Sequence, residues 1–125
     1  MENKNKVIVI SGASSGIGKE TAFKFAEEGY TLVLSYNKNK EEGEKTKSIC
    51  LGKGAYDVML LHLDLLDQKS IDSFINNVEQ KFGKITCLIN NAGIYHYKKF
   101  NDHSIQEIEE QVQVNLIGLM KLTRI

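Results

Sequence analysis

The chain has 125 residues, of which 42% are hydrophobic, as in one soluble globular domain or part of one. Sixteen basic residues balance sixteen acidic ones without a long run of either sign, which argues against a nucleic-acid partner or an anionic membrane surface. The apolar runs are far shorter than the ~20 residues that cross a bilayer, and the N-terminus has no apolar leader region, so we expect a cytoplasmic protein.

The first part of the chain alternates between strand and helix patterns. Residues 6–10 form a continuous apolar run, typical of a strand buried on both faces of a parallel sheet. Residues 17–28 carry apolar side chains at helical spacing, and Gly29 follows as a stop signal. A β-branched and apolar run over 31–36 predicts a second strand.

The remaining elements continue the alternation and are, in chain order, a polar helix from Asn39 to near Gly52, a strand over 56–63, a helix over 68–82, a strand over 85–89 and a helix from Ser104 toward the C-terminus. Asn39 with Glu42 and Ser104 with Glu107 have the spacing of capping boxes, and Asp67 is a candidate N-cap. Residues 120–125 stay in the helical pattern with no stop signal, so the expected helix runs into a cut chain end.

Strands that alternate with helices predict βαβ units and a parallel sheet with helices on both faces. We therefore expect an α/β fold of three layers. The cysteines and histidines add no metal site, because Cys50 and Cys87 form no CxxC and His62, His96 and His103 are scattered. Both thiols are expected to be reduced, with Cys87 packed as a small core residue.

A glycine-rich turn, SGASSGIG at residues 11–18, connects the first strand to the first helix. Gly12 permits a sharp exit from the strand, Gly16 lets a pyrophosphate approach the backbone, and Gly18 lets the helix pack closely on the sheet. The GxxxGxG spacing differs from the GxGxxG fingerprint, and Glu20 stands where a P-loop needs Ser or Thr. The turn predicts a phosphate cradle, and the alternative is a glycine-rich turn without a ligand.

A second motif, NNAG at residues 90–93, follows the fourth strand. In a sheet of order 3-2-1-4 the first and fourth strands are neighbours and flank the switch point at which ligands bind. We therefore expect this motif to face the glycine-rich turn, and the alternative is an ordinary polar turn.

With these motifs the chain resembles the short-chain dehydrogenase/reductase family, in particular the 3-oxoacyl-carrier-protein reductases and related carbonyl reductases. The family carries TGxxxGxG, an acidic residue after strand three, NNAG after strand four and an Asn in the next helix. This chain has Ser11 in place of the Thr, the glycines of residues 12–18, Asp64, residues 90–93 and Asn115. The resemblance implies a partial Rossmann-type sheet of order 3-2-1-4, with residues 1–125 as the N-terminal part of one NAD(P)-binding domain.

The resemblance also implies a cofactor site. The Asp64 carboxylate would accept a hydrogen bond from the adenine amino group, unless it is only a strand-end turn acid. Asn115 would hold a water in the catalytic proton relay, unless it is only a partly exposed helix residue. The implied cofactor-binding residues are Gly12, Ser14, Ser15, Gly16, Ile17, Gly18, Tyr36, Asn37, Asp64, Leu65, Asn91, Ala92 and Gly93.

The end of the second strand bears on the choice of cofactor. NAD-preferring members place an acid there, toward the ribose 2′-OH. Here the sequence is Tyr36-Asn37-Lys38, so we expect NADPH rather than NADH, although Ser15 stands where NADPH-specific loops often carry Arg. Expected partners are a small carbonyl, alcohol or acyl-carrier-linked substrate and a second copy of the chain, because the strand at 85–90 and the apolar face of 105–125 are uncovered.

The family's chemistry also needs a Ser, a Tyr and a Lys four residues after that Tyr, all beyond the end of this chain. Tyr36 with Lys40 and Tyr95 with Lys99 have the Tyr-Lys spacing but directly follow strands. We therefore expect a parent enzyme that transfers a hydride between nicotinamide and a carbonyl or alcohol carbon, and a 125-residue chain that is inactive. One alternative is a non-catalytic nucleotide-binding or redox-sensing module. Another is a flavodoxin- or receiver-like domain, which would need an acidic pair after the first strand.

Overall fold

The computed structural model describes residues 2–125 and contains one parallel sheet of four strands. The strands are β1 (Val7–Ile10), β2 (Thr31–Tyr36), β3 (Asp57–His62) and β4 (Cys87–Ile89), in the order β3-β2-β1-β4. The helices are α1 (Gly16–Glu27), α2 (Lys40–Lys53), α3 (Gln68–Phe82), the 3-10 helix η1 (Phe100–Asp102), α4 (Ile105–Val112), the π-helical segment η2 (Gln113–Gly118) and α5 (Leu119–Leu122). The expected α/β fold and strand order are confirmed.

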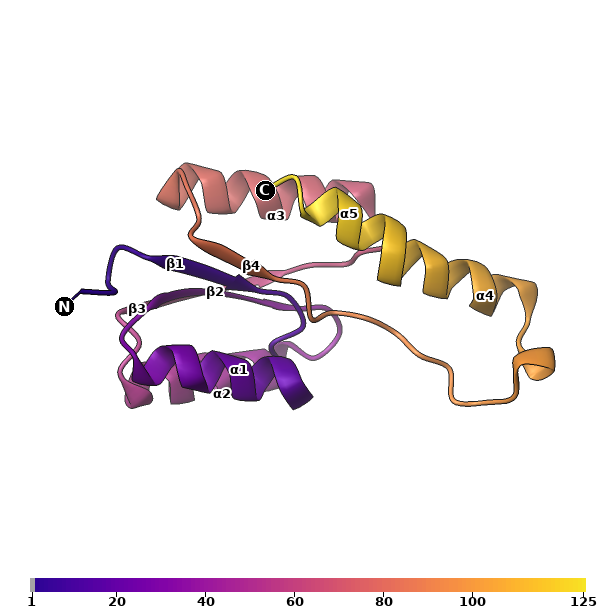
Figure 1. Ribbon diagram of the computed structural model, residues 1–125, viewed down its shortest axis with the longest axis horizontal. Helices are drawn as coiled ribbons and strands as arrows, with labels where there is room; N and C mark the ends of the chain where they lie inside the picture. The colour runs from indigo at the N-terminus through magenta and orange to yellow at the C-terminus, as the bar shows by residue number, and fades with distance from the viewer. Residues whose placement is uncertain (1) are drawn as a thin grey trace.

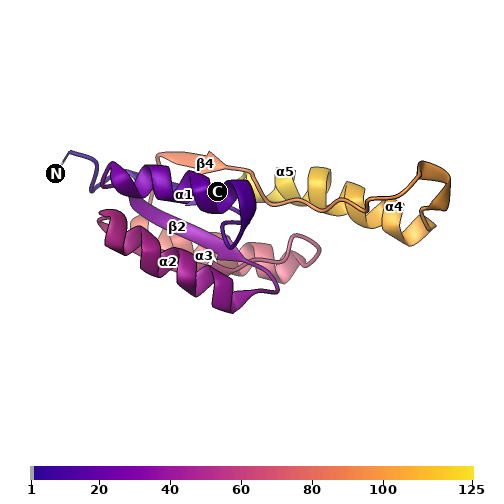
Figure 2. The same cartoon turned by 90° about the horizontal axis from the view of Figure 1, so that it is seen from below.

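Two apolar cores lie on opposite faces of the sheet, because successive strand side chains point in opposite directions. In β1, Val7 and Val9 pack toward α3, whereas Ile8 and Ile10 pack toward α1 and α2. Figure 1 shows α3 and α5 on one face of the sheet and α1 and α2 on the other. From below, α1 and α2 lie side by side across the strands (Figure 2). The three expected layers are therefore present.

A side-chain cap is present at the N-termini of α2, α3 and α4 and absent at the N-terminus of α1. Asn39 accepts a hydrogen bond from the Glu42 N–H at 3.1 Å, Asp67 accepts from Lys69 N–H at 3.0 Å, and Ser104 with Glu107 forms a complete capping box. These contacts confirm the predicted starts of α2, α3 and α4. The N-cap of α1 makes no side-chain capping bond, so the N–H groups of its first turn have no side-chain acceptor.

Three expectations about the second half of the chain are wrong. Cys87 is exposed and not a core residue, because β4 is the edge strand and pairs, within the described residues, only with β1. The strand is also shorter than 85–89. The last helix does not run to the chain end: it changes to π-helical geometry in η2 and ends at Leu122, before a turn over Thr123 and Arg124.

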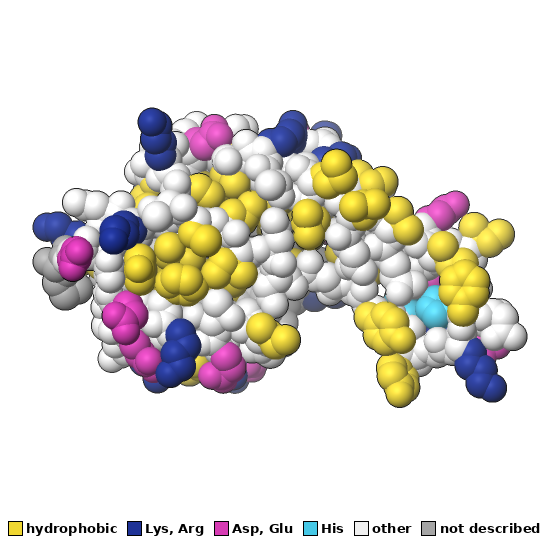
Figure 3. All heavy atoms as spheres, viewed as in Figure 1, with side chains coloured by type: hydrophobic (Ala, Val, Ile, Leu, Met, Phe, Trp, Pro, Cys, Tyr) yellow, Lys and Arg dark blue, Asp and Glu magenta, His cyan; other side chains and the backbone are white. Residues whose placement is uncertain are grey.

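Residues 93–112 form an arm, in which the loop after β4 and helix α4 extend away from the sheet (Figure 1). Hydrophobic side chains lie on the surface of this arm and continue along the last helix (Figure 3). The exposed apolar residues of α4, η2 and α5 are Ile105, Ile108, Val112, Leu116, Ile117 and Met120. Within residues 2–125, no helix has both the length and the apolar character needed to cross a membrane.

Candidate functional site

Ser11 joins the two motifs into one unit at the carboxyl ends of β1 and β4. Its side chain is 1% exposed, and its Oγ accepts hydrogen bonds from the N–H groups of Asn91 at 3.1 Å and Ala92 at 3.0 Å. The Ser11 N–H donates to the Ile89 carbonyl at 3.1 Å. The glycine-rich turn and the turn after β4 therefore meet, as the predicted strand order requires.

Gly12 and Gly18 are fixed by close packing of the two turns. The Asn91 side-chain amide donates to the Gly12 carbonyl at 2.9 Å. Gly12 has φ +69°, and a Cβ there would lie 2.9 Å from the Ala92 Cα. A Cβ on Gly18 would collide with the Asn91 amide and with the Gly12 carbonyl. Both positions need glycine for contacts within the protein itself.

Gly16 is different, because no heavy atom lies within 4 Å of the position that its Cβ would occupy. Its φ of +58° turns the chain into α1, whose first N–H groups have no side-chain acceptor. Ser14 is half-buried beside this turn, and Ser15 and Ile17 are exposed. Open space in front of unpaired N–H donors at a helix N-terminus suits an anionic group such as a phosphate.

Ser35, for which the sequence predicted no role, attaches the end of β2 to this cradle. Its Oγ accepts from the Gly12 N–H at 2.9 Å, and its carbonyl accepts from the Ala13 N–H at 3.0 Å. A small hydroxyl residue directly after the apolar run of residues 32–34 was the available signal. The contact brings the residues that follow, half-buried Tyr36 and exposed Asn37, beside the glycine-rich turn.

Asp64 and Leu65 form the turn between β3 and α3. One carboxylate oxygen of Asp64 accepts from the Leu66 N–H at 3.0 Å, as a turn acid does, which leaves the other oxygen for a ligand. The Leu65 side chain is buried in the core on the α3 face. A Cβ on Gly118 would lie 2.7 Å from the Leu65 carbonyl, which shows how closely η2 packs on this turn.

Asn115 lies in η2 and binds the loop after β4. Its Oδ1 accepts from the Ile94 N–H at 2.8 Å, and its Nδ2 donates to the Ile94 carbonyl at 2.7 Å. A Cβ on Gly93 would lie 3.0 Å from the same Oδ1. Asn115 therefore positions the start of the arm, and π-helical segments of this kind often occur at functional sites. Its role toward a relay water stays a prediction.

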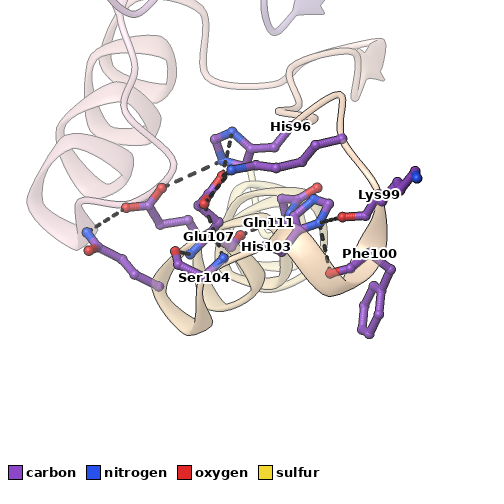
Figure 4. A network of polar contacts seen from close by, with 10 residues as sticks. His96, Lys99, Phe100, His103, Ser104, Glu107 and Gln111 are labelled. Atoms are coloured by element: carbon purple, nitrogen blue, oxygen red, sulfur yellow. Dashed lines mark hydrogen bonds and ion pairs between the residues drawn. The ribbon is translucent and has the colours of Figure 1, made fainter.

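A polar network that sequence reasoning missed holds the arm together (Figure 4). The Lys98 ammonium lies 2.7 Å from the Glu107 carboxylate, and the His96 ring nitrogens lie 3.6 Å from Glu107 and 3.9 Å from Glu110. The hydrogen bond from Lys98, with those from Ser104, lowers the pKa of Glu107 to about 2. No group of three His, Cys, Asp or Glu side chains within residues 2–125 could hold a metal ion.

Comparison with known proteins identifies relatives of this site and fold. The family model described as short chain dehydrogenase matches residues 6–125. Dehydrogenase/reductase SDR family member 7 of Mus musculus is 36% identical over 126 residues, which cover 98% of this chain and 37% of that protein. The 3-oxoacyl-[acyl-carrier-protein] reductase FabG of Staphylococcus aureus is 32% identical over 114 residues, which cover 91% of this chain and 46% of the reductase.

A solved alcohol dehydrogenase from the archaeon Thermococcus sibiricus, complexed with 5-hydroxy-NADP, matches this structure with a TM-score of 0.87 at 32% identity. The match covers 95% of this chain and 50% of that one. The chain thus spans about half the length, or less, of the relatives it matches. Since the family match extends over nearly the whole chain and the solved relative has the same fold, the chain belongs to the short-chain dehydrogenase/reductase family.

Proposed function

We propose that this chain binds NADPH as the dinucleotide-binding half of an oxidoreductase that transfers a hydride between nicotinamide and a carbonyl or alcohol carbon. The observation that carries the proposal is the cradle at Gly16, where a left-handed glycine with open space beside it starts a helix without a side-chain cap. Membership of a dehydrogenase family supports the same interpretation. So does the archaeal relative, which was solved in complex with an NADP derivative.

The proposed contacts come from four turns at one edge of the sheet. The glycine-rich turn, with Gly12, Ser14, Ser15, Gly16, Ile17 and Gly18, would hold the pyrophosphate. Tyr36 and Asn37 would contact the adenosine ribose, and Asp64 with the Leu65 backbone would bind the adenine. Asn91, Ala92 and Gly93 would lie under the cofactor on its way toward the nicotinamide.

The preference for NADPH over NADH follows from the end of β2. An acidic residue at this position would repel a 2′-phosphate and accept from a ribose hydroxyl. The residues here are Tyr36, Asn37 and Lys38, which carry no carboxylate. The 2′-phosphate of NADPH therefore meets no repelling charge from this turn.

The reaction needs groups that these 125 residues do not supply. Bound NADPH supplies the hydride, and the residues of this chain bind and orient it. Asn115 would hold a water that passes a proton toward the substrate oxygen. Because FabG is named as an acyl-carrier-protein reductase, the substrate class extends from small ketones and alcohols to acyl-carrier-linked carbonyls. We expect no turnover of reactive ketones by the 125-residue chain alone.

Gly16→Ala tests the cradle, with Gly83→Ala as its matched control. Both glycines have positive φ and open space around the missing Cβ, so both variants should lose similar stability. Only the Gly16→Ala methyl group would project into the path of the pyrophosphate. By calorimetric titration, Gly16→Ala should weaken NADPH binding by at least about tenfold, and Gly83→Ala by less than about twofold. Equal affinities for the two variants would contradict the proposal.

We also propose a second copy of the chain as a partner, bound through the exposed apolar face of α4, η2 and α5. Ile105 is 76% exposed and Met120 is 62% exposed, although both carry large apolar side chains. An exposed apolar stripe of this kind marks an interaction surface. The unpaired edge of β4 is a second surface open to association.

A further inference from the structure

His62 stands at the carboxyl end of β3, directly beside Tyr36 at the end of β2. The two residues are register partners in the parallel pair, and their rings meet edge to face with centroids 5.6 Å apart. Tyr36 is half-buried and His62 is exposed, so the imidazole lies on the solvent side of the tyrosine. The tyrosine ring therefore holds the histidine ring at the edge where the proposed ribose contacts lie.

Ser70, in the first turn of α3, lies on the other side of His62. Its Oγ accepts from the Asp64 N–H at 2.8 Å and lies 3.5 Å from the His62 Nδ1. An imidazole ring carries an N–H on at least one of its two nitrogens. The exposed His62 ring therefore has an N–H donor to offer to a ligand.

The position of the cradle indicates what this donor would meet. In folds of this type the residue at the end of β2 contacts the 2′-position of the adenosine ribose. Ser35 fixes the glycine-rich turn against the end of β2 through two hydrogen bonds, and Tyr36 is the next residue. A 2′-phosphate has only acceptor oxygens, and hydrogen bonds to an ionised acceptor are the strong ones.

Building on the proposed function, we infer that His62 is a cofactor-selectivity residue, whose ring N–H donates to the 2′-phosphate of NADPH. Tyr36 positions the imidazole through the contact between the two rings. NADH, which has a hydroxyl at this position, gains little from the donor. Nothing in the local sequence indicates this role, because the pair forms only when β2 and β3 align.

The test compares three variants in direct binding measurements. His62→Phe keeps a ring against Tyr36 and removes the donor, His62→Gln keeps an N–H donor, and His103→Phe replaces a histidine of the arm. The probes are NADPH, NADH, 2′,5′-ADP and 5′-ADP. His62→Phe should weaken the binding of NADPH and of 2′,5′-ADP about tenfold. It should change the affinity for NADH and for 5′-ADP by less than about twofold.

His62→Gln should recover part of that loss, and His103→Phe should bind all four probes as the wild type does. A second readout is the ¹⁵N spectrum of the histidine rings, in which 2′,5′-ADP should shift the His62 signals and leave those of His103 in place. If His62→Phe weakened the binding of NADPH and NADH equally, or of neither, the inference would be overturned and the proposed function would stand. A wild-type chain that binds none of the four probes would overturn both.

Discussion

Ser11→Ala removes the one hydroxyl that joins the turns after β1 and β4. The substitution takes away the Ser11 Oγ, which accepts from the Asn91 N–H at 3.1 Å and the Ala92 N–H at 3.0 Å. The Asn91 N–H keeps the Ile89 carbonyl as an acceptor at 3.1 Å, so only the Ala92 N–H is left without one. A buried donor left without a partner costs about 1–3 kcal/mol. The Ala92 contact is part-buried, so the lower half of that range applies. The expected loss in the free energy of unfolding is about 1–2 kcal/mol.

The assay is urea denaturation followed by circular dichroism, with Ser15→Ala as the control. Ser15 is exposed and its side chain makes no capping bond, so its truncation should change the unfolding free energy by less than about 0.5 kcal/mol. For a domain of this size the Ser11→Ala loss corresponds to a melting temperature lowered by about 5 °C. If Ser11→Ala and Ser15→Ala unfolded at the same urea concentration, the assigned role of Ser11 would be wrong.

Three further predictions concern the arm, the thiols and assembly. The pKa of the Glu107 carboxyl is about 2 in the folded chain, against an ordinary value of 4.5. Its ionised carboxylate therefore stabilises the fold above pH 4.5, and this stabilisation is lost as the pH falls toward 2. In urea titrations between pH 5 and 2, the free energy of unfolding should therefore fall less for Glu107→Gln than for the wild type. If the free energy of unfolding fell equally for both, the pairing of Glu107 with Lys98 would be wrong. At pH 8 a thiol reagent should label one cysteine per folded chain, exposed Cys87, because burial raises the pKa of Cys50 to about 11; two fast thiols would contradict this. Leu116→Glu should abolish self-association in light scattering, and a wild-type monomer at high concentration would refute the proposed interface.

Local patterns in the sequence predicted most of the elements. The strand at 31–36 and the helix at 68–82 have the predicted bounds. The strand is marked by an apolar run, and the helix by an apolar stripe between a cap and a stop residue, and these local patterns depend on few distant contacts. The strand order was also predictable, since right-handed crossovers leave few topologies for this alternation. The prediction for Cys87 failed, because an apolar run does not show whether its strand lies at the edge of a sheet.

The candidate site was predictable in its motifs and not in its contacts. The glycine-rich turn and the motif at 90–93 could be recognised from spacing, and Gly12 and Gly18 occupy close-packed positions in the structure. The hydroxyls of Ser11 and Ser35 hold those turns through partners far away in the sequence, which no local pattern reports. The ion pair between Lys98 and Glu107 joins residues nine positions apart and depends on how the loop of the arm folds back on α4.

The most direct test of the central claim is a two-dimensional ¹⁵N–¹H titration of the chain with NADPH. We expect the largest, saturable shifts at the backbone amides of Gly16, Ile17 and Gly18, because these N–H groups would receive the pyrophosphate. The Gly83 amide, at the far end of α3, should not move. No saturable shift at residues 16–18, or shifts confined to the arm, would contradict the assignment of this chain as a dinucleotide-binding half.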